Sequence, residues 1–112
     1  MRPPFSVELE HNDHACIARL HGEVDLANAS DVEHQLERAT DADDQSEMLV
    51  IDLTEVEYID SSGFGMLERL ARRVPVRVVI PPGAVVERAF AVTGLDRVLP
   101  AFSSVSEATR LD

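Results

Sequence analysis

The sequence predicts a single α/β domain in which helices pack against a mixed, mostly parallel sheet. Segments with the pattern of short strands alternate with segments that have the period of a helix, along the whole chain. Residues 48–53 are almost continuously apolar, which is typical of a strand covered on both faces. The 112 residues are enough for one hydrophobic core, and no linker or internal repeat divides them. We therefore expect one domain over residues 1–112, with a flexible start at residues 1–5.

The first half of the chain predicts a hairpin, a helix and a buried strand. Residues 6–9 and 15–21 are the expected strands of the hairpin, joined by a turn at residues 11–14. Asn28 is the expected N-cap of the helix, because its side-chain oxygen can accept a hydrogen bond from a free backbone N–H. An acidic loop at residues 40–47 is expected before the buried strand. One face of the helix is apolar: Val32, Leu36 and Ala39.

The second half of the chain predicts two more strands and three helices. The sheet should then contain about five strands and the domain about four helices. We expect a helix from Ser61 or Ser62 to Pro75, a strand at residues 76–80, a helix closed by Gly94, a strand at residues 97–99 and a helix that begins at Ser104.

The charge balance favours a protein partner over a nucleic acid or a membrane. Ten arginines stand against twenty-one acidic residues, so the formal net charge is −11. A field of this sign repels phosphate backbones and anionic lipid surfaces but attracts basic proteins. The absence of lysine also excludes Schiff-base chemistry and the phosphate-binding lysine of a Walker loop. We expect no cofactor, and a small basic patch on the second helix from Arg69, Arg72 and Arg73.

Membrane and redox signals are also weak in this sequence. No segment has the length and hydrophobicity of a membrane span, and the first residues lack the apolar stretch of a signal peptide. The single cysteine, Cys16, cannot form an internal disulfide. It falls in a strand that we expect to face the core, where a thiol is usually inert. These features favour the cytoplasm.

The segment Asp60-Ser61-Ser62-Gly63, at the start of the second helix, is the candidate functional site. Ser and Asp at a helix start are common N-caps, which is the simplest explanation for a single serine there. Two adjacent serines exceed what one cap needs, and Gly63 removes side-chain bulk beside them. A phosphate on Ser61 would add about −1.5 to −2 charges beside Asp60, and beside Asp25 if its loop lies close. Phosphorylation should therefore weaken a contact that the unmodified serine makes.

Enzymatic and metal-binding explanations are weaker. Ser61 with Gly63 resembles half of a hydrolase nucleophile elbow, but Ile59 stands where the first glycine is expected. All four histidines precede Ser61, whereas that fold places its base after the nucleophile. His11 and His14 flank turn-forming residues, so a solvated turn explains them better than a metal site. We predict that the chain is not an enzyme and has no catalytic or metal-binding residues.

Four short segments along the chain carry a family resemblance. Each is modestly specific alone, but the four in this order and spacing are strongly specific for one fold. They are Gly22-Glu23-Val24-Asp25, residues 49–53, residues 58–63 and residues 93–99. On these segments the chain resembles the STAS domain, and within it the bacterial anti-sigma factor antagonists. Phe64 departs from the family pattern, because an aliphatic residue usually follows the glycine, and it adds an aromatic side chain near the expected interface.

The resemblance implies a partner switch controlled by phosphorylation. In the family, the serine directly after the Asp of the Asp-Ser-Ser-Gly motif is phosphorylated, which corresponds to Ser61. An anti-sigma factor that is itself a serine kinase binds the unmodified antagonist and so frees a sigma factor. A PP2C-type phosphatase restores the serine. With Ser61 as the phosphate acceptor, we expect Ser62 to support the cap of the helix. We expect the partner surface to contain Asp25, Asn28, Asp60, Ser61, Ser62, Gly63 and Phe64.

A constitutive STAS interaction subunit, in a scaffold or a transporter complex, is the alternative. Such members often lack the phosphorylatable serine, so the presence of Ser61 favours the antagonist. Co-purification with a transporter ATPase in place of a kinase would favour the alternative.

Overall fold

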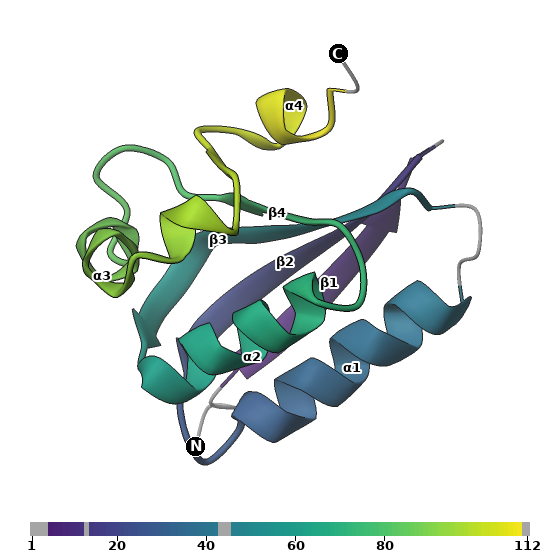
Figure 1. Ribbon diagram of the computed structural model, residues 1–112. Coiled ribbons are helices and arrows are strands. Elements are labelled where there is room, and N and C mark those ends of the chain that lie inside the picture. Colours follow the sequence, from purple (N-terminus) through teal and green to yellow (C-terminus); the bar gives the residue numbers. More distant parts are fainter. Residues whose placement is uncertain (1–4, 13, 43–45, 111–112) are drawn as a thin grey trace.

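The described part of the chain forms one five-stranded sheet with helices on both faces (Figure 1). The computed structural model describes residues 5–12, 14–42 and 46–110. The strands are β1 (Phe5–His11), β2 (Ala15–Val24), β3 (Met48–Ile59), β4 (Val76–Val79) and β5 (Ala101–Phe102). The helices are α1 (Ala29–Ala42), α2 (Ser61–Ala71), α3 (Glu87–Thr93) and α4 (Val105–Ala108), with a 3₁₀ helix, η1 (Leu95–Arg97), after α3. The predicted α/β class, with five strands and four helices, is confirmed.

The strands lie in the order in which they occur in the sequence, β1-β2-β3-β4-β5. β1 and β2 are antiparallel, and each later strand is parallel to the one before it. The successive crossovers therefore step in the same direction along the sheet. Because such crossovers are nearly always right-handed, the helices in them must lie on the same face. This explains why α1, α2 and α3 contribute to one core on one side of the sheet.

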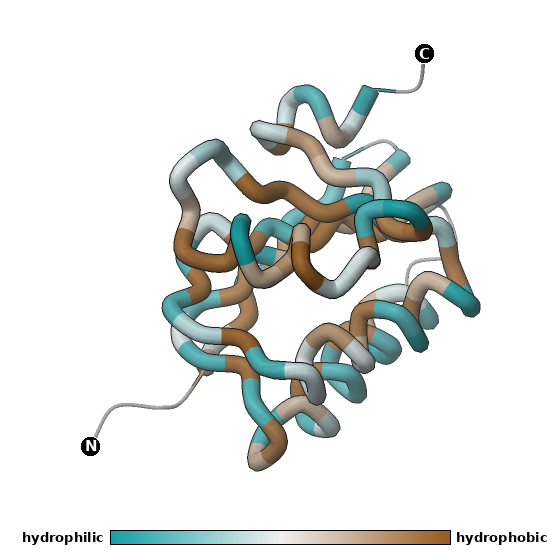
Figure 2. The backbone as a smooth tube through the Cα atoms, turned by 60° about the vertical axis from the view of Figure 1, so that its left-hand side comes forward, coloured by the Kyte–Doolittle hydropathy of each residue, from teal (hydrophilic) through white to brown (hydrophobic). Residues whose placement is uncertain are grey.

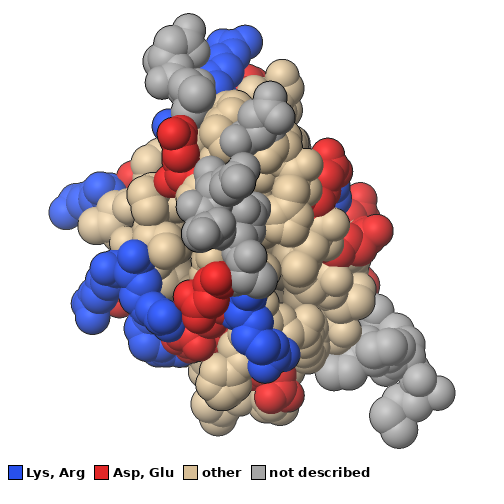
Figure 3. Space-filling model, turned by 90° about the vertical axis from the view of Figure 1, so that its right-hand side faces the viewer, with Lys and Arg blue, Asp and Glu red and all other residues tan. Residues whose placement is uncertain are grey.

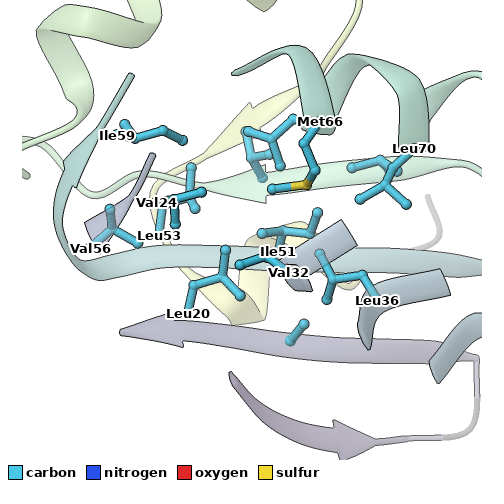
Figure 4. Packing of buried hydrophobic residues seen from close by; sticks show 14 of the residues in the cluster. Leu20, Val24, Val32, Leu36, Ile51, Leu53, Val56, Ile59, Met66 and Leu70 are labelled. Carbon is cyan, nitrogen blue, oxygen red and sulfur yellow. The ribbon is translucent and has the colours of Figure 1, made fainter. Parts of the chain in front are cut away.

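The main core lies between that face and the three helices. Figure 4 shows side chains of α1 and α2, among them Leu36 and Met66, gathered over those of β2 and β3, among them Leu20 and Ile51. These four side chains are almost completely buried. The predicted apolar face of α1 is confirmed, and Figure 2 shows α1 alternating between hydrophobic and hydrophilic residues along its length. Burial of this face accounts for the one-sided pattern of α1.

The opposite face of the sheet is only partly covered. Ala108 of α4 packs with Ile17 and Val50 in a second, smaller core. The first six residues of β3 are buried, which confirms that this strand is covered on both sides. Away from α4 the same face carries charge, since Arg19 bonds Glu10 across β1 and β2 at 2.7 Å.

Several boundaries differ from those expected from the sequence. β2 continues to Val24, because a positive φ of 92° at Gly22 and shifts in register let the strand bend and remain paired. α1 continues to Ala42, so the start of the expected acidic loop is helical, while residues 43–45 lie outside the described residues. α2 ends at Ala71, before Pro75 is reached.

The ends of the chain also differ from expectation. The predicted last strand at residues 97–99 is wrong, because the left-handed Gly94 that closes α3 leads directly into the 3₁₀ helix η1. Leu99 is fully buried without being in a strand, and the strand follows it as β5. The predicted cap at Ser104 is confirmed, since its hydroxyl accepts the N–H of Glu107 at 3.2 Å. Residues 1–4 of the expected flexible start lie outside the described residues, and Phe5 begins β1.

Candidate functional site

The segment Asp60-Ser61-Ser62-Gly63 joins β3 directly to α2. Ile59 ends β3 and Ser61 begins α2, which leaves Asp60 as the N-cap in an extended conformation. Its Oδ1 accepts hydrogen bonds from the backbone N–H groups of Ser62 at 2.9 Å and Gly63 at 3.3 Å. The carboxylate therefore satisfies N–H groups that a helix start leaves unpaired.

Neither serine is the helix cap, which corrects the supporting role expected for Ser62. Ser62 is half-buried and Ser61 is exposed. Among the residues that the structure describes, no group hydrogen-bonds to the Ser61 hydroxyl. Because Asp60 caps the helix, the Ser61 hydroxyl is available to a partner or to a modifying group.

The loop between β2 and α1 is held against the same helix start. The second carboxylate oxygen of Asp60, Oδ2, accepts a hydrogen bond from the backbone N–H of Leu26 at 3.3 Å. The N–H of Asp60 donates to the carbonyl oxygen of Val24 at 3.2 Å. Asp60 thus joins the end of β2, the loop and the start of α2. Asp25 lies in the chain between Val24 and Leu26, the two residues that Asp60 contacts.

Asn28 stands just before α1, where an N-cap is expected, but its side chain holds the loop instead. Its Oδ1 accepts the N–H of Asp25 at 3.0 Å, and its Nδ2 donates to the carbonyl of Glu23 at 2.9 Å. Asn28 is only 3% exposed, so it positions the loop from beneath and offers no side chain to a partner. The Asp25 side chain accepts the N–H of Ala27 at 3.0 Å, which tightens the same loop.

Gly63 and Phe64 belong to the packing of α2, which changes the roles expected for them. A Cβ on Gly63 would lie 2.5 Å from Cγ1 of Ile59 and 3.0 Å from Cγ1 of Val24. Glycine is therefore required for the close approach of α2 to the strands, and it does not open the backbone to another molecule. Phe64 is 6% exposed, and the centroid of its ring lies 6.3 Å from that of Phe90 in the core.

Ser61 lines two open hollows on the surface. The hollow between α1 and α2 has a volume of about 260 Å³. It is lined by Leu26, Ala29, Ser30, Ser61, Ser62, Gly65 and Arg69. The other hollow lies between α2 and the end of α3, where Ser61 shares it with Phe64, Thr93 and Leu95. Leu26, one of the residues that line the first hollow, is 81% exposed. The sequence did not indicate it as a site residue, because a leucine in a short loop belongs to no periodic pattern.

Arg69 of α2 and the two arginines just after this helix do not form a free basic patch, contrary to the expectation from the sequence. Arg69 donates to Glu33 of α1 from Nη2 at 2.7 Å and from Nε at 3.1 Å. Arg73 pairs in the same way with Glu37 of α1. The hydrogen bonds from Arg69 hold the pKa of Glu33 below its usual value. On the face shown in Figure 3, arginine and acidic side chains accordingly lie beside one another.

The histidine-containing turn between β1 and β2 has a structural explanation. The side chain of Asn12 accepts the backbone N–H of His14 at 3.0 Å, and Asp13 lies outside the described residues. Nε2 of His14 lies 2.6 Å from the carbonyl oxygen of Thr109. Cys16 is fully buried. Among the described residues, no group of three or more His, Cys, Asp or Glu side chains is placed to hold a metal ion. Nor does the described chain contain a helix that is long and apolar enough to cross a membrane.

Comparisons with known proteins identify the family. The family model of the STAS domain matches residues 6–108. The chain belongs to the STAS domain family. The anti-sigma-F factor antagonist RsfB of Mycobacterium tuberculosis is 31% identical to this STAS domain, over 96% of the chain and 91% of the relative. The anti-sigma F factor antagonist of Paenibacillus polymyxa is 29% identical over 96% of each.

A solved structure agrees with the sequence relatives. The crystal structure of an anti-sigma factor antagonist from Mycobacterium paratuberculosis matches this STAS domain with a TM-score of 0.82 at 26% identity. The match covers 93% of this chain and 90% of that one. The resemblance on which the family prediction rested is therefore confirmed.

The expected site residues of this STAS domain fall into two groups. One group reaches the surface at the β2–α1 loop and the start of α2: Asp25, Asp60, Ser61 and Ser62. The other group lies beneath them and fixes their positions: Asn28, Gly63 and Phe64. Leu26 and Arg69 line the hollow beside Ser61, although no site role was expected for either.

Proposed function

We propose that this protein is an anti-sigma factor antagonist whose unmodified form binds an anti-sigma factor and so releases a sigma factor. Phosphorylation of Ser61 ends that contact. Two relatives that match almost the whole chain carry the name of anti-sigma factor antagonist, which supports the class of partner. The observation that carries the proposal is the exposed Ser61 hydroxyl, which Asp60 leaves uncommitted by capping α2 in its place.

The protein is the substrate of the phosphoryl transfer, and the catalyst is its partner. Ser61 Oγ attacks the terminal phosphorus of ATP held by an anti-sigma factor that is a serine kinase. The bond from that phosphorus to ADP breaks, and the hydroxyl proton passes to a base of the kinase. Open hollows on both sides of Ser61 leave room for the incoming phosphate. A PP2C-type phosphatase hydrolyses the phosphoserine and restores the hydroxyl, and the whole cycle belongs to the cytoplasm.

The direction of the switch follows from the charges around Ser61. The phosphate adds about −1.5 to −2 charges at neutral pH. It is attached one residue after Asp60, whose carboxylate is hydrogen-bonded to the loop that carries Asp25. Several negative charges in one contact area are costly to remove from water without cations opposite them. A partner that binds the hydroxyl form is therefore repelled by the phosphorylated form.

Mass mapping tests the acceptor. The purified protein is incubated with ATP and a candidate anti-sigma kinase, and the modified residue is identified by mass spectrometry. We expect phosphate on Ser61, none on the Ser61→Ala variant, and normal modification of Ser106→Ala. Ser106 is an exposed serine of α4, which packs on the other face of the sheet. Phosphate that persists in Ser61→Ala contradicts the assignment.

Binding measurements test the direction. We expect Ser61→Glu to weaken binding of the anti-sigma factor at least about tenfold, which corresponds to about 1.4 kcal/mol. Ser106→Glu adds the same charge on the α4 side and should leave the affinity unchanged. If Ser61→Glu binds as tightly as the unmodified protein, the proposed switch is wrong.

A further inference from the structure

The hollow between α1 and α2 is lined by a positively charged side chain as well as by the proposed phosphate acceptor. Arg69 and Ser61 both line it. Ser61, Gly65 and Arg69 are spaced four residues apart in α2, so they lie on successive turns of one side of the helix. Gly65 has no side chain between them, and a Cβ placed there would meet Nη1 of Arg69 at 3.5 Å. The guanidinium therefore already extends over Gly65 towards the turn that carries Ser61.

The present contact of Arg69 can be exchanged. Nε and Nη2 face the carboxylate of Glu33, whereas Nη1 takes no part in that pair. The Arg69 side chain is 53% exposed. The Glu33 side chain is only 16% exposed, so losing its cation has a cost that a new acceptor for Arg69 must outweigh. Arg69 can therefore leave Glu33 only for an acceptor that carries more charge than a carboxylate.

We propose that Arg69 binds the phosphate on Ser61 and gives up its contact with Glu33 to do so. This inference rests on the proposed phosphorylation of Ser61. A phosphate carries more charge than a carboxylate and matches the planar donors of a guanidinium. The N–H groups of Ser62 and Gly63 are already taken by Asp60, so the start of α2 cannot hold the phosphate with these two donors.

Through this exchange, phosphorylation would rearrange the side chains around the hollow in addition to adding charge. Arg69 and Glu33 link α2 to α1 at the side of the hollow. When Arg69 turns to the phosphate, it crosses the open surface at Gly65 and the link at Glu33 is lost. The hollow that a partner meets in the unmodified protein is then occupied by an arginine and a phosphate from the same helix.

A titration of the phosphate tests this contact without a kinase. Phosphoserine is installed at position 61 of the full chain during translation, and the second pKa of the phosphate is measured by ³¹P NMR. A cation within reach stabilises the dianion, so we expect Arg69→Gln to raise this pKa by about half a unit or more. Arg72→Gln removes the same charge from the residue that follows α2, but Arg72 does not line the hollow. Equal shifts in the two variants overturn the inference.

A second pair of variants tests the exchange with Glu33. Glu33→Gln removes the competing carboxylate, so Arg69 should bind the phosphate more tightly and lower its pKa below that of the parent phosphoprotein. Glu37→Gln removes the same charge from the next turn of α1, where Arg73 is the partner. If Glu33→Gln lowers the pKa no more than Glu37→Gln does, no exchange takes place.

The two proposals can fail separately. Since the phosphoserine is installed without a kinase, a failure of every kinase to modify Ser61 contradicts the proposed function alone. A phosphate that titrates independently of Arg69 contradicts only the present inference.

Discussion

At the residue scale, Asp60 connects three segments of backbone at the site. One oxygen caps α2, the other holds the N–H of Leu26, and the backbone N–H bonds the end of β2. The two oxygens of an ionised carboxylate can accept several hydrogen bonds at once, which a serine hydroxyl cannot do in the same geometry. The position of Ser61 relative to the β2–α1 loop therefore depends on the residue that precedes it.

Substitutions of Asp60 should separate its capping role from its charge. Asp60→Ala removes the acceptors and should lower the free energy of unfolding by about 1–2 kcal/mol. Asp60→Asn keeps one acceptor oxygen and should retain most of the stability, since Asn and Asp cap helices about equally well. Urea denaturation measures both. Equal losses in the two variants would show that the charge, and not the cap, stabilises the junction.

Gly63 should tolerate no larger side chain. Gly63→Ala places a Cβ against Ile59 and Val24, and overpacking of this kind lowers the free energy of unfolding by about 1–3 kcal/mol. Gly65→Ala, two residues later in the same helix, is the matched control. Its Cβ meets only the end of a flexible arginine, so the higher helix propensity of alanine should leave stability unchanged or raised. Urea denaturation distinguishes them, and similar values for the two variants contradict the packing explanation.

At the element scale, α1 and α2 are joined by ion pairs as well as by the core. The Arg69 hydrogen bonds lower the pKa of Glu33 from its ordinary value of 4.5. A carboxyl whose pKa is lowered in the folded protein stabilises it above the unfolded pKa, and that stabilisation is lost as the pH falls through the folded pKa. The contribution of Glu33 is thus complete at neutral pH and disappears in acid.

The comparison of wild type with Glu33→Gln should depend on pH in that sense. We expect wild type to be the more stable of the two at about pH 7, and the difference to vanish well below about pH 4, once Glu33 is protonated. Glu68→Gln serves as a control, because Glu68 is an exposed residue of α2 whose contact, at 3.9 Å, is with Arg72. Urea denaturation at each pH provides the free energies of unfolding. A difference for Glu33→Gln that is the same at both pH values would falsify this account.

The predictability of each element depended on how much of it is periodic. α1 and the first part of β3 could be predicted because burial of one or both faces leaves a regular apolar pattern. β5 could not, since it has two residues and no pattern can emerge from two. The apolar pair at residues 98–99 resembles part of a buried strand. Leu99 is indeed buried, but it packs into the core just after a 3₁₀ helix and not as part of a strand.

The site was predictable in its location and less so in its internal roles. An Asp-Ser-Ser-Gly segment between a strand and a helix already indicates the junction. Asp and Ser cap helices about equally well, so the sequence does not reveal that Asp60 is the cap. The roles of Gly63 and Asn28 depend on contacts with β2 and β3, which no local pattern contains. The same is true of Arg69, whose partner is 36 residues away.

At the scale of the whole molecule, the net charge of −11 should govern how fast a partner arrives. An anti-sigma factor with positive charge outside the contact at Ser61 would be attracted over distances of about 10 Å at an ionic strength of about 0.1 M, and added salt would screen that attraction. We expect the association rate constant to fall about tenfold between low and high salt, with little change in dissociation. Stopped-flow mixing at several salt concentrations measures this.

Leu26→Ala provides the contrast for that experiment. Leu26 is uncharged and 81% exposed, so its removal should speed dissociation and leave the salt dependence of association unchanged. An association rate that does not change with salt would mean that the net charge plays no part in the encounter.

Asp60 also bears on how such a protein can evolve. The carboxylate that opposes a phosphate at Ser61 in the proposed switch is the same group that caps α2, so its loss would also weaken the fold. Under the proposed function, regulation by charge needs only a hydroxyl at one further position beside this cap. If Ser61 is the phosphate acceptor, as proposed, we expect a single substitution there to convert a regulated protein into a permanently active one. The docking surface around it can be inherited unchanged through that step.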